Sequence, residues 1–400
     1  MPASDASSPI PSTPVELRVR ATAFVLTAFD VGQGIDLDEA EKRLSAGAQR
    51  QGLGVGKRTP AYLDYRPLPV RVSGVAERVE VKGVAGAEGA RQPVPRWQTE
   101  PSFDAVLYDF GAVSVTQRIV FEGTLEDLLE LSDALYEHSP IMAEAGRVLL
   151  TVTGAIHEAV ARPLVAEVQE CYVVFQLEDP RVAELVRERH AETDGLIAGI
   201  LRSERNRLSE GEITDALAAR ISYGERDAVL IDWNAAIIVD PGEALPGAPG
   251  AGRGGEDVRF VLEYANVELL EMRVLDDRLD QILDESYRIV AEKRTRLTGG
   301  HRGMNRIARL QMDSALLYEG VNNAIKLVGD QYLARVYRLA ANRFHLPERD
   351  STIERKLSTL ESIYSKLQDR RSAVRLEVLE WIVIVLIFVE IVIGLWTLKK

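Results

Sequence analysis

The first 240 residues carry short apolar runs, most of them alternating with polar positions, and this pattern predicts β-strands joined by short helices. The predicted strands are 16–30, 103–115 (with a bend at 109–111), 147–153, 170–177 and a pair within 225–240. Helices are expected at 36–51, at 124–136 (capped by Thr124) and within 180–220. The fold class predicted for 16–240 is therefore α+β, built on a mostly antiparallel sheet.

The pattern changes after a Gly- and Pro-rich loop at 241–257 that has no hydrophobic period. From residue 258 onward the apolar positions recur at helical spacing, with breaks at Thr298–Gly300 and at Pro347. Three long helices separated by short breaks are typical of antiparallel helical hairpins. Residues 258–378 are therefore expected to form a helical hairpin or coiled-coil stalk.

The third of these helices carries the clearest pattern, an apolar stripe whose members alternate three and four residues apart from Ile353 to Leu395. Such a heptad pattern is typical of helices that pack along a seam. The partner is either the two preceding helices or the same helix of another subunit, and we expect both. The residues predicted to form the oligomer seam are Leu357, Leu360, Tyr364, Leu367, Val374 and Val378.

The segment LEWIVIVLIFVEIVIGLWTL at 379–398 is almost entirely apolar. A helix of this length covers roughly 30 Å, the thickness of the hydrocarbon core of a bilayer. We therefore expect one C-terminal transmembrane helix, with Glu380 and Trp381 at the membrane interface. A carboxylate inside a bilayer costs about 2.5 kcal/mol or more, so Glu390 is expected to make an intramembrane polar contact between helices.

Charge and composition predict the cellular location of the protein. The formal net charge of −13 argues against nucleic-acid binding by the protein as a whole, although 301–356 is mildly basic. The single cysteine, Cys171, excludes intrachain disulfides. Residues 1–15 lack the features of a signal peptide and are expected to be a disordered lead-in. With an Ala-, Arg- and Gly-rich composition, these features predict a single-pass protein of the bacterial inner (cytoplasmic) membrane whose N-terminal domain faces the cytoplasm.

Candidate catalytic chemistry is sparse. The five histidines have no metal-ligand spacing and no nucleophile motif is present, so no catalytic residue, metal site, cofactor or small-molecule substrate is expected. The segment VGQGID at 31–36 lies between a predicted strand and a predicted helix, the position of a phosphate-binding loop, but it lacks the third glycine of that motif. It leaves open one alternative, a membrane-anchored nucleotide-binding enzyme of unknown reaction.

A second alternative rests on the basic helical region. Arg335, Arg338 and Arg343 form a candidate partner face within it. Clustered arginines attract the phosphate backbone of nucleic acids and also anionic lipid surfaces. On this alternative the protein is a factor that tethers a ribosome or RNA at the membrane.

Several segments together resemble the required-for-meiotic-nuclear-division family, a family of membrane proteins with a domain of unknown function. The segments that carry the resemblance are ATAFVLTAFD (21–30), FDAVLYDFGAVSV (103–115), ISYGERDAVLIDW (221–233), ELLEMRVLDDRLD (268–280) and RLEVLEWIVIVLIFVEIVIG (375–394). The resemblance implies an integral membrane protein without a known catalytic activity. It also implies oligomeric members that hold ribosomes near a membrane.

Taken together, these features predict a non-enzymatic, membrane-anchored oligomeric scaffold or tether with its bulk in the cytoplasm. The expected partners are the lipid bilayer, further copies of this chain, and a ribosome or another protein.

Overall fold

The protein, seen in a computed structural model, divides into two compact units. The structure describes residues 17–44, 48–50, 67–83, 95–240, 254–292 and 331–397. The first unit combines 1–274 with 320–349, and the second combines 275–319 with 350–400. Three predicted segments lie wholly or partly outside the described residues: the lead-in at 1–15, the loop at 241–257 and the helix at 304–344. Residues 254–257 of the predicted loop belong to a helix that begins at Gly254.

The first unit is built on a nine-stranded sheet with the strand order β11-β12-β13-β10-β1-β8-β7-β4-β3. Its strands are β1 (Arg18–Asp30), β3 (Ala48–Arg50), β4 (Val70–Gly74), β7 (Phe103–Leu107), β8 (Ala112–Thr124), β10 (Gln169–Leu177), β11 (Arg220–Ile221), β12 (Ala228–Ile231) and β13 (Ala235–Val239). Neighbouring strands are antiparallel except β10 and β13, which are parallel. Two small sheets pair β2 (Gly34–Ile35) with β9 (Val160–Ala161) and β5 (Glu80–Lys82) with β6 (Pro95–Gln98). The large, mostly antiparallel sheet predicted for this part of the chain is confirmed.

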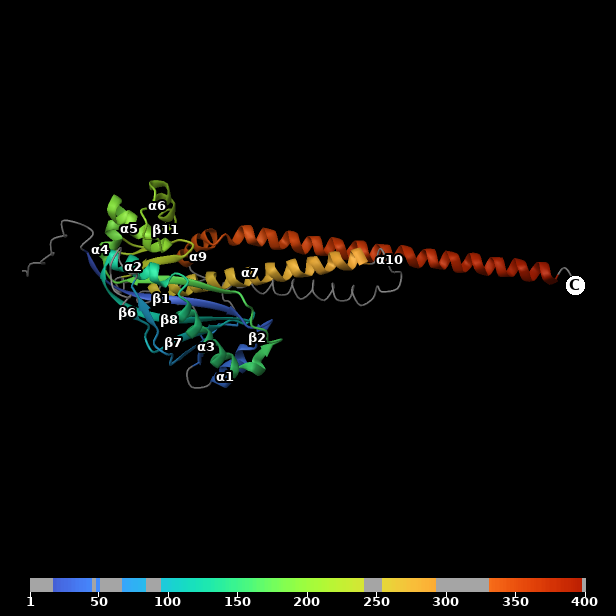
Figure 1. Cartoon of the computed structure of the whole chain (residues 1–400), viewed down its shortest axis with the longest axis horizontal. Helices are drawn as coiled ribbons and strands as arrows, with labels where there is room; N and C mark the ends of the chain where they lie inside the picture. Colours follow the sequence, from blue (N-terminus) through green and yellow to red (C-terminus); the bar gives the residue numbers. More distant parts are fainter. Residues whose placement is uncertain are drawn as a thin grey trace, which may run out of the picture. The chain divides into compact units, whose positions relative to one another are not determined.

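Strand β1 lies between β8 and β10 and organises the sheet. Figure 1 shows it as a long blue strand of the sheet. All 13 of its residues pair with β8. The turn between β7 and β8 closes with the Tyr108 amide donating to the Ala112 carbonyl at 3.0 Å, and Gly111 has φ +104° there. The strand predicted at 16–30 and the hairpin predicted at 103–115 are thus confirmed. Gly111 allows the tight turn of the hairpin, because its positive φ is a backbone conformation that other residues rarely adopt.

The helices of the chain follow from their caps and apolar spacing. They are α1 (Leu37–Leu44), α2 (Leu125–Leu135), α3 (Ser139–Ala155), α4 (Pro180–Glu188), α5 (Ala191–Arg202), α6 (Glu210–Ala216), α7 (Gly254–Glu292), α9 (Gln331–Arg343) and α10 (Leu346–Thr397), with a short 3-10 turn at His157–Ala159. Thr124 and Asp127 form the capping box of α2, as expected for a helix that begins after Thr124. Helix α10 begins before Pro347, because proline is well tolerated in the first turn of a helix.

The strand predicted at 147–153 is wrong, since these residues belong to α3. The β-branched run there suggested a strand. The buried positions Ile141, Ala145, Val148, Leu149 and Val152 instead recur three and four residues apart, which places them on one face of a helix. His138 and Pro140 start the helix well before the apolar run.

The two faces of the sheet differ in polarity. Ala23 and Val25 of β1 pack with Leu128 of α2 in an apolar core to which α4 and α5 also contribute. Helices α1 and α3 take part in a second apolar cluster. Because successive residues of a strand point to opposite faces, Phe24 lies on the other side, under the guanidinium of Arg259 from α7. That second face carries charged side chains.

In the second unit, part of α10 packs on the C-terminal part of α7. The Lys356 ammonium lies 2.6 Å from a carboxylate oxygen of Asp276 and 2.6 Å from one of Asp280, which are one turn apart on α7. Ile353 and Leu360 are completely buried although only this chain is present. The beginning of the apolar stripe is therefore covered within the chain itself.

The predicted transmembrane helix is not found. Helix α10 has 52 residues, and its described exposed apolar side chains run from Leu379 to Ile391. Two glutamates, Glu380 and Glu390, lie within that stretch. Among the residues that the structure describes, no helix is long and apolar enough to cross a bilayer. The predictions of a C-terminal transmembrane anchor and of a single-pass location in a bacterial inner membrane are wrong, and the membrane roles of Glu380, Trp381 and Glu390 lose their basis.

Two glycines give a matched test of this fold. A Cβ at Gly111 would collide with the carbonyl oxygen of Gly32 and would have to accept a positive φ, whereas a Cβ at Gly146 in α3 meets no atom within 4 Å. We expect Gly111→Ala to lower the free energy of unfolding by about 2 kcal/mol or more. Gly146→Ala should raise it by about 0.5–1 kcal/mol. Urea unfolding measures both, and equal effects would contradict the turn geometry.

Candidate functional site

A cluster of charged side chains is buried on the sheet face that α7 covers. Its centre is Asp104 of β7, whose side chain is 7% exposed. Arg71 of β4 donates to Asp104 with 2.7 Å between Nη2 and Oδ2, and Arg118 of β8 and the Ser73 hydroxyl also donate to this carboxylate. Arg71 Nη1 lies 3.2 Å from an oxygen of Glu256 on α7. Side chains of β4 and β8 thus donate to one carboxylate of β7, and α7 joins the cluster through Arg71.

Helix α7 contributes two further charged groups to this cluster. Glu263 is buried, and the Thr116 hydroxyl lies 3.3 Å from its Oε1. Arg259 stacks on the Phe24 ring, 3.9 Å from its centroid, and donates to Gln176 Oε1 at 3.0 Å. Both residues point from α7 toward strands of the sheet, so a polar layer separates this helix from the sheet.

The two buried carboxyl groups have opposite pKa shifts. Burial alone would raise the pKa of Asp104, but hydrogen bonds from Arg71, Ser73 and Arg118 outweigh it and lower the pKa from 3.8 to about 2. Burial raises the pKa of Glu263 above 4.5, although Ser114, Arg259 and Arg71 act in the other direction. Carboxyl groups whose pKa values are shifted in opposite directions are common at functional sites.

The space within the cluster is small. The centre of a water-sized sphere can occupy only about 10 Å³ there, which is room for one water-sized particle. The lining residues are Phe24, Arg71, Asp104, Val106, Thr116, Glu256, Arg259, Phe260 and Glu263. An organic substrate does not fit in this space, so the cluster is not a catalytic cleft in this conformation.

Sequence reasoning missed this cluster completely. A signal was present, because Asp104 and Arg118 interrupt apolar runs of strands. A charged residue inside such a run indicates a strand face on which a buried charge must be paired with an opposite charge. The partners on α7, however, are up to 185 residues away along the chain, as for Arg71 and Glu256.

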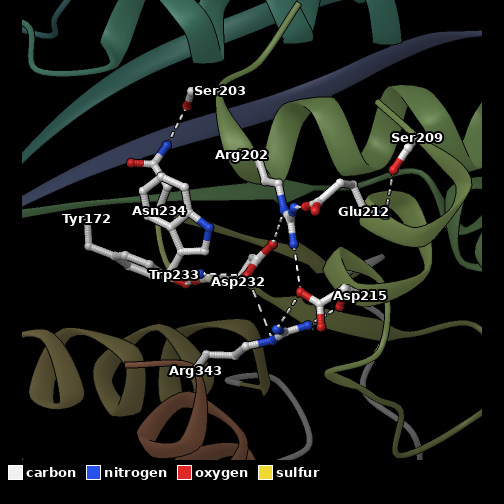
Figure 2. A network of polar contacts seen from close by, with 10 residues as sticks. All are labelled: Tyr172, Arg202, Ser203, Ser209, Glu212, Asp215, Asp232, Trp233, Asn234 and Arg343. Carbon is white, nitrogen blue, oxygen red and sulfur yellow. Dashed lines mark hydrogen bonds and ion pairs between the residues drawn. The ribbon is translucent and has the colours of Figure 1, made fainter. Parts of the chain in front are cut away.

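A second polar network joins α9 to the end of β12 (Figure 2). The side chain of Asp232 is completely buried, with Oδ2 3.0 Å from Arg202 Nε and Oδ1 3.8 Å from Arg343 Nε. Asp215 of α6 lies 2.7 Å from Arg202 Nη2 and 3.1 Å from Arg343 Nη1. Figure 2 shows both carboxylates between the two guanidinium groups. Arg343 therefore has two acidic partners, and Arg202 has the same two and Glu212 as a third.

Neighbouring contacts fix this network in place. The Tyr172 hydroxyl donates to the backbone carbonyl of Asp232 at 2.9 Å, and the Tyr172 ring meets Phe344 edge-on with centroids 5.0 Å apart. On α9, the Tyr337 hydroxyl donates to a carboxylate oxygen of Glu268 on α7 at 2.6 Å. Helix α9 is therefore held at both α7 and the sheet.

The three arginines predicted to form a basic partner face lie in different environments. Arg335 and Arg338 are exposed on α9, whereas the Arg343 side chain is only 17% exposed and is paired with Asp215 and Asp232. A role in RNA or ribosome binding stays a prediction for Arg335 and Arg338.

The loop at 31–36 is not arranged as a phosphate-binding loop. Its amides from Val31, Gly32, Gln33, Ile35 and Asp36 all donate to oxygen atoms of the protein, at 2.8–2.9 Å. A Cβ at Gly32 would lie 2.8 Å from the carbonyl oxygen of Ala161, so close packing explains this glycine. The amides that would hold a phosphate are already used.

The predicted seam residues divide into two groups. Leu360 is completely buried, and Leu357 and Tyr364 are partly buried in the second unit. The side chains of Leu367, Val374 and Val378 lie outside the described residues. Their assignment to an interface between subunits stays a prediction. Farther along α10, Glu380, Trp381 and Glu390 are all exposed.

Other reactive groups give no additional site. Burial raises the pKa of Cys171 to about 11, which disfavours the reactive thiolate. In the described part of the chain, no group of three or more His, Cys, Asp or Glu side chains is placed to hold a metal ion.

Asp104 makes a pH-dependent contribution to stability. Because its folded pKa of about 2 lies below 3.8, the ionised carboxylate stabilises the fold above about pH 4, and this is lost as the pH falls toward 2. We expect Asp104→Asn to lower the free energy of unfolding by about 2 kcal/mol at pH 7 and by much less at pH 2.5. Urea unfolding at both pH values measures this, and an equal loss at both would contradict an electrostatic role.

Asp232 gives a test of the second network. Asp232→Asn removes a buried charge opposite Arg202 and Arg343, and we expect it to cost about 3 kcal/mol of unfolding free energy. Glu122→Gln is the control, because its pair with Arg20 is exposed (63% and 72%) and should contribute little. Similar losses in the two variants would contradict a special role of the buried pair.

Comparison with known proteins places the sheet unit in a family. Residues 20–244 match the family described as uncharacterized protein MJ0711, N-terminal domain. The uncharacterized protein MJ0711 of the archaeon Methanocaldococcus jannaschii is 25% identical over 208 residues, 51% of this chain. The chain spans 60% of the length of that relative. No solved structure matches.

These matches refine two predictions. A domain of unknown function is confirmed, whereas membership of the required-for-meiotic-nuclear-division family is not. The relative is archaeal, which gives no support to the predicted bacterial source. The match extends from β1 to just beyond β13 and so includes all nine strands of the large sheet. This chain belongs to the MJ0711 N-terminal domain family.

Proposed function

We propose that this protein is a non-enzymatic scaffold that assembles with further copies of itself through the C-terminal part of α10. The observation that supports this is the stretch Leu379–Ile391. Its large apolar side chains are 45% exposed at Val389 and up to 67% exposed at Trp381. A contiguous apolar surface of this kind marks an interaction site in most proteins.

The sides of this helix are not equivalent. Trp381, Val385 and Phe388 continue the three-and-four spacing of the apolar stripe. At about 100° per residue, Glu380 and Glu390 lie roughly 80° apart, on the side opposite that stripe. One side of the helix is therefore suited to pack against a like helix while the glutamates remain in water.

The breadth of the apolar surface indicates the number of copies. A two-helix seam covers only a narrow stripe of each helix. Ile382 (50% exposed) and Leu386 (61% exposed) lie beside the stripe rather than on it, and a dimer would leave them uncovered. We therefore propose an assembly of at least three copies.

The resemblance noted in the sequence agrees with this role. The required-for-meiotic-nuclear-division family, which five segments resemble, implies oligomeric proteins without a known catalytic activity. A ribosome or RNA as a further partner rests only on Arg335 and Arg338, which are exposed on α9. The occupied amides of the loop at 31–36 do not favour the nucleotide-binding alternative.

Two equally exposed apolar residues provide the test. Phe388 (65% exposed) lies on the proposed seam, whereas Leu150 (67% exposed) lies on α3. A charge buried in a seam is strongly unfavourable, so Phe388→Glu should weaken self-association of the full chain at least tenfold. Leu150→Glu should leave it unchanged. Sedimentation analysis of the three proteins measures the masses and the association constants.

Three results would contradict the proposal. They are a monomeric wild-type chain at micromolar concentration, an unchanged assembly of Phe388→Glu, or an equal loss in Leu150→Glu. A wild-type mass of two chains would contradict the proposed copy number.

A further inference from the structure

Arg259 is a half-buried cation without a contacting anion among the described residues. Its guanidinium carries five N–H donors, stacks on Phe24 and donates to Gln176 Oε1. Among the described residues, no carboxylate oxygen lies within 4 Å of it. Burial lowers the pKa of Arg259, and Glu263 and Glu256 oppose this only by longer-range attraction. The guanidinium lines the cavity, and none of its donors is used by a carboxylate of the described residues.

The charge of the whole cluster depends on one proton. It combines three guanidinium and three carboxyl groups, those of Arg71, Arg118, Arg259, Asp104, Glu256 and Glu263. With all three carboxyl groups ionised the cluster is neutral. When Glu263, whose pKa is raised by burial, is protonated, the cluster has a net charge of +1. An excess charge in a partly buried cavity favours a counter-ion beside it.

The size of the cavity limits the counter-ion. The room of about 10 Å³ for the centre of a water-sized sphere lies among Arg71, Thr116, Arg259 and Glu263. A chloride ion is only slightly larger than a water molecule, whereas a polyatomic organic anion does not fit. Guanidinium N–H groups, a hydroxyl group and the edge of an aromatic ring are all suitable neighbours for a halide.

We propose that the cavity beneath α7 binds one monoatomic anion of the size of chloride, between Arg259 and Arg71, when the Glu263 carboxyl is protonated. The ionised Glu263 carboxylate and the halide neutralise the same arginines and therefore exclude each other. Halide binding thus takes up one proton. This site goes beyond the scaffold role and does not depend on self-association.

The groups that face Glu263 come from each element packed around it. Arg71 lies on β4, Asp104 on β7, and Ser114, Thr116 and Arg118 on β8, while α7 itself supplies Glu256 and Arg259. Asp104 is ionised above about pH 2. Burial raises the pKa of Glu263, so we assign the uptake of the proton to this carboxyl group.

The direct test measures chloride binding to the folded full chain. The ³⁵Cl resonance broadens when chloride exchanges with a protein site, and unfolding in sodium chloride against sodium gluconate at equal ionic strength gives the stabilisation. We expect excess broadening and stabilisation by chloride at pH 5. The apparent dissociation constant should rise about tenfold per pH unit once the pH exceeds the pKa of Glu263.

Three variants separate this site from general salt effects. Glu263→Gln should bind chloride with the same affinity at pH 5 and pH 8, because its side chain is always neutral. Arg259→Met should lose the excess broadening, whereas Arg338→Met, at an exposed arginine on α9, should keep it. The ³⁵Cl measurement on the wild-type protein remains decisive even if a variant does not fold.

Two results would overturn the proposal. One is equal stabilisation by chloride and gluconate without excess ³⁵Cl broadening in the wild type. The other is chloride binding that is unchanged in Arg259→Met or independent of pH in the wild type.

Discussion

The burial of charged groups between the sheet and α7 is the constraint on which the first unit depends. Each charge on this face loses water, so each must meet an opposite charge or a hydrogen-bond donor. Asp104 satisfies this through Arg71 and Ser73 of β4 and through Arg118 of β8. A one-residue slip of β8 would turn Arg118 toward the apolar core, so the register of the sheet follows from the pairing of charges.

The same kind of contact closes the fold over long stretches of chain. Arg71 reaches Glu256 across 185 residues, and Arg343 reaches Asp215 across 128. In the first case α7 is joined to strand β4 and in the second α9 is joined to helix α6, each through an ion pair in addition to apolar packing. Ion pairs of this kind specify one arrangement because an unpaired buried charge is so unfavourable. The apolar face, in contrast, tolerates exchanges of similar volume.

The division of the fold into ion-paired and apolar contacts bears on function. The polar layer beneath α7 leaves space for one small particle, and the loop at 31–36 uses its amides internally. Neither offers a surface to an organic substrate. The largest apolar surface of the described residues lies instead on α10, between Leu379 and Ile391. The proposed assembly role rests on this exposed apolar surface.

The sequence alone determined the local elements with strong patterns. Alternation placed β1, β7, β8, β10 and the β12–β13 pair, and Thr124 marked the start of α2, because these signals depend on neighbours in the chain. It failed at 147–153, where β-branched residues belong to a helix, and at 379–398, where composition suggested a membrane span. The charge cluster around Asp104 and the network around Asp232 were decided only by the tertiary structure. Their partners are distant in the sequence, and which charge meets which depends on how the strands and helices pack.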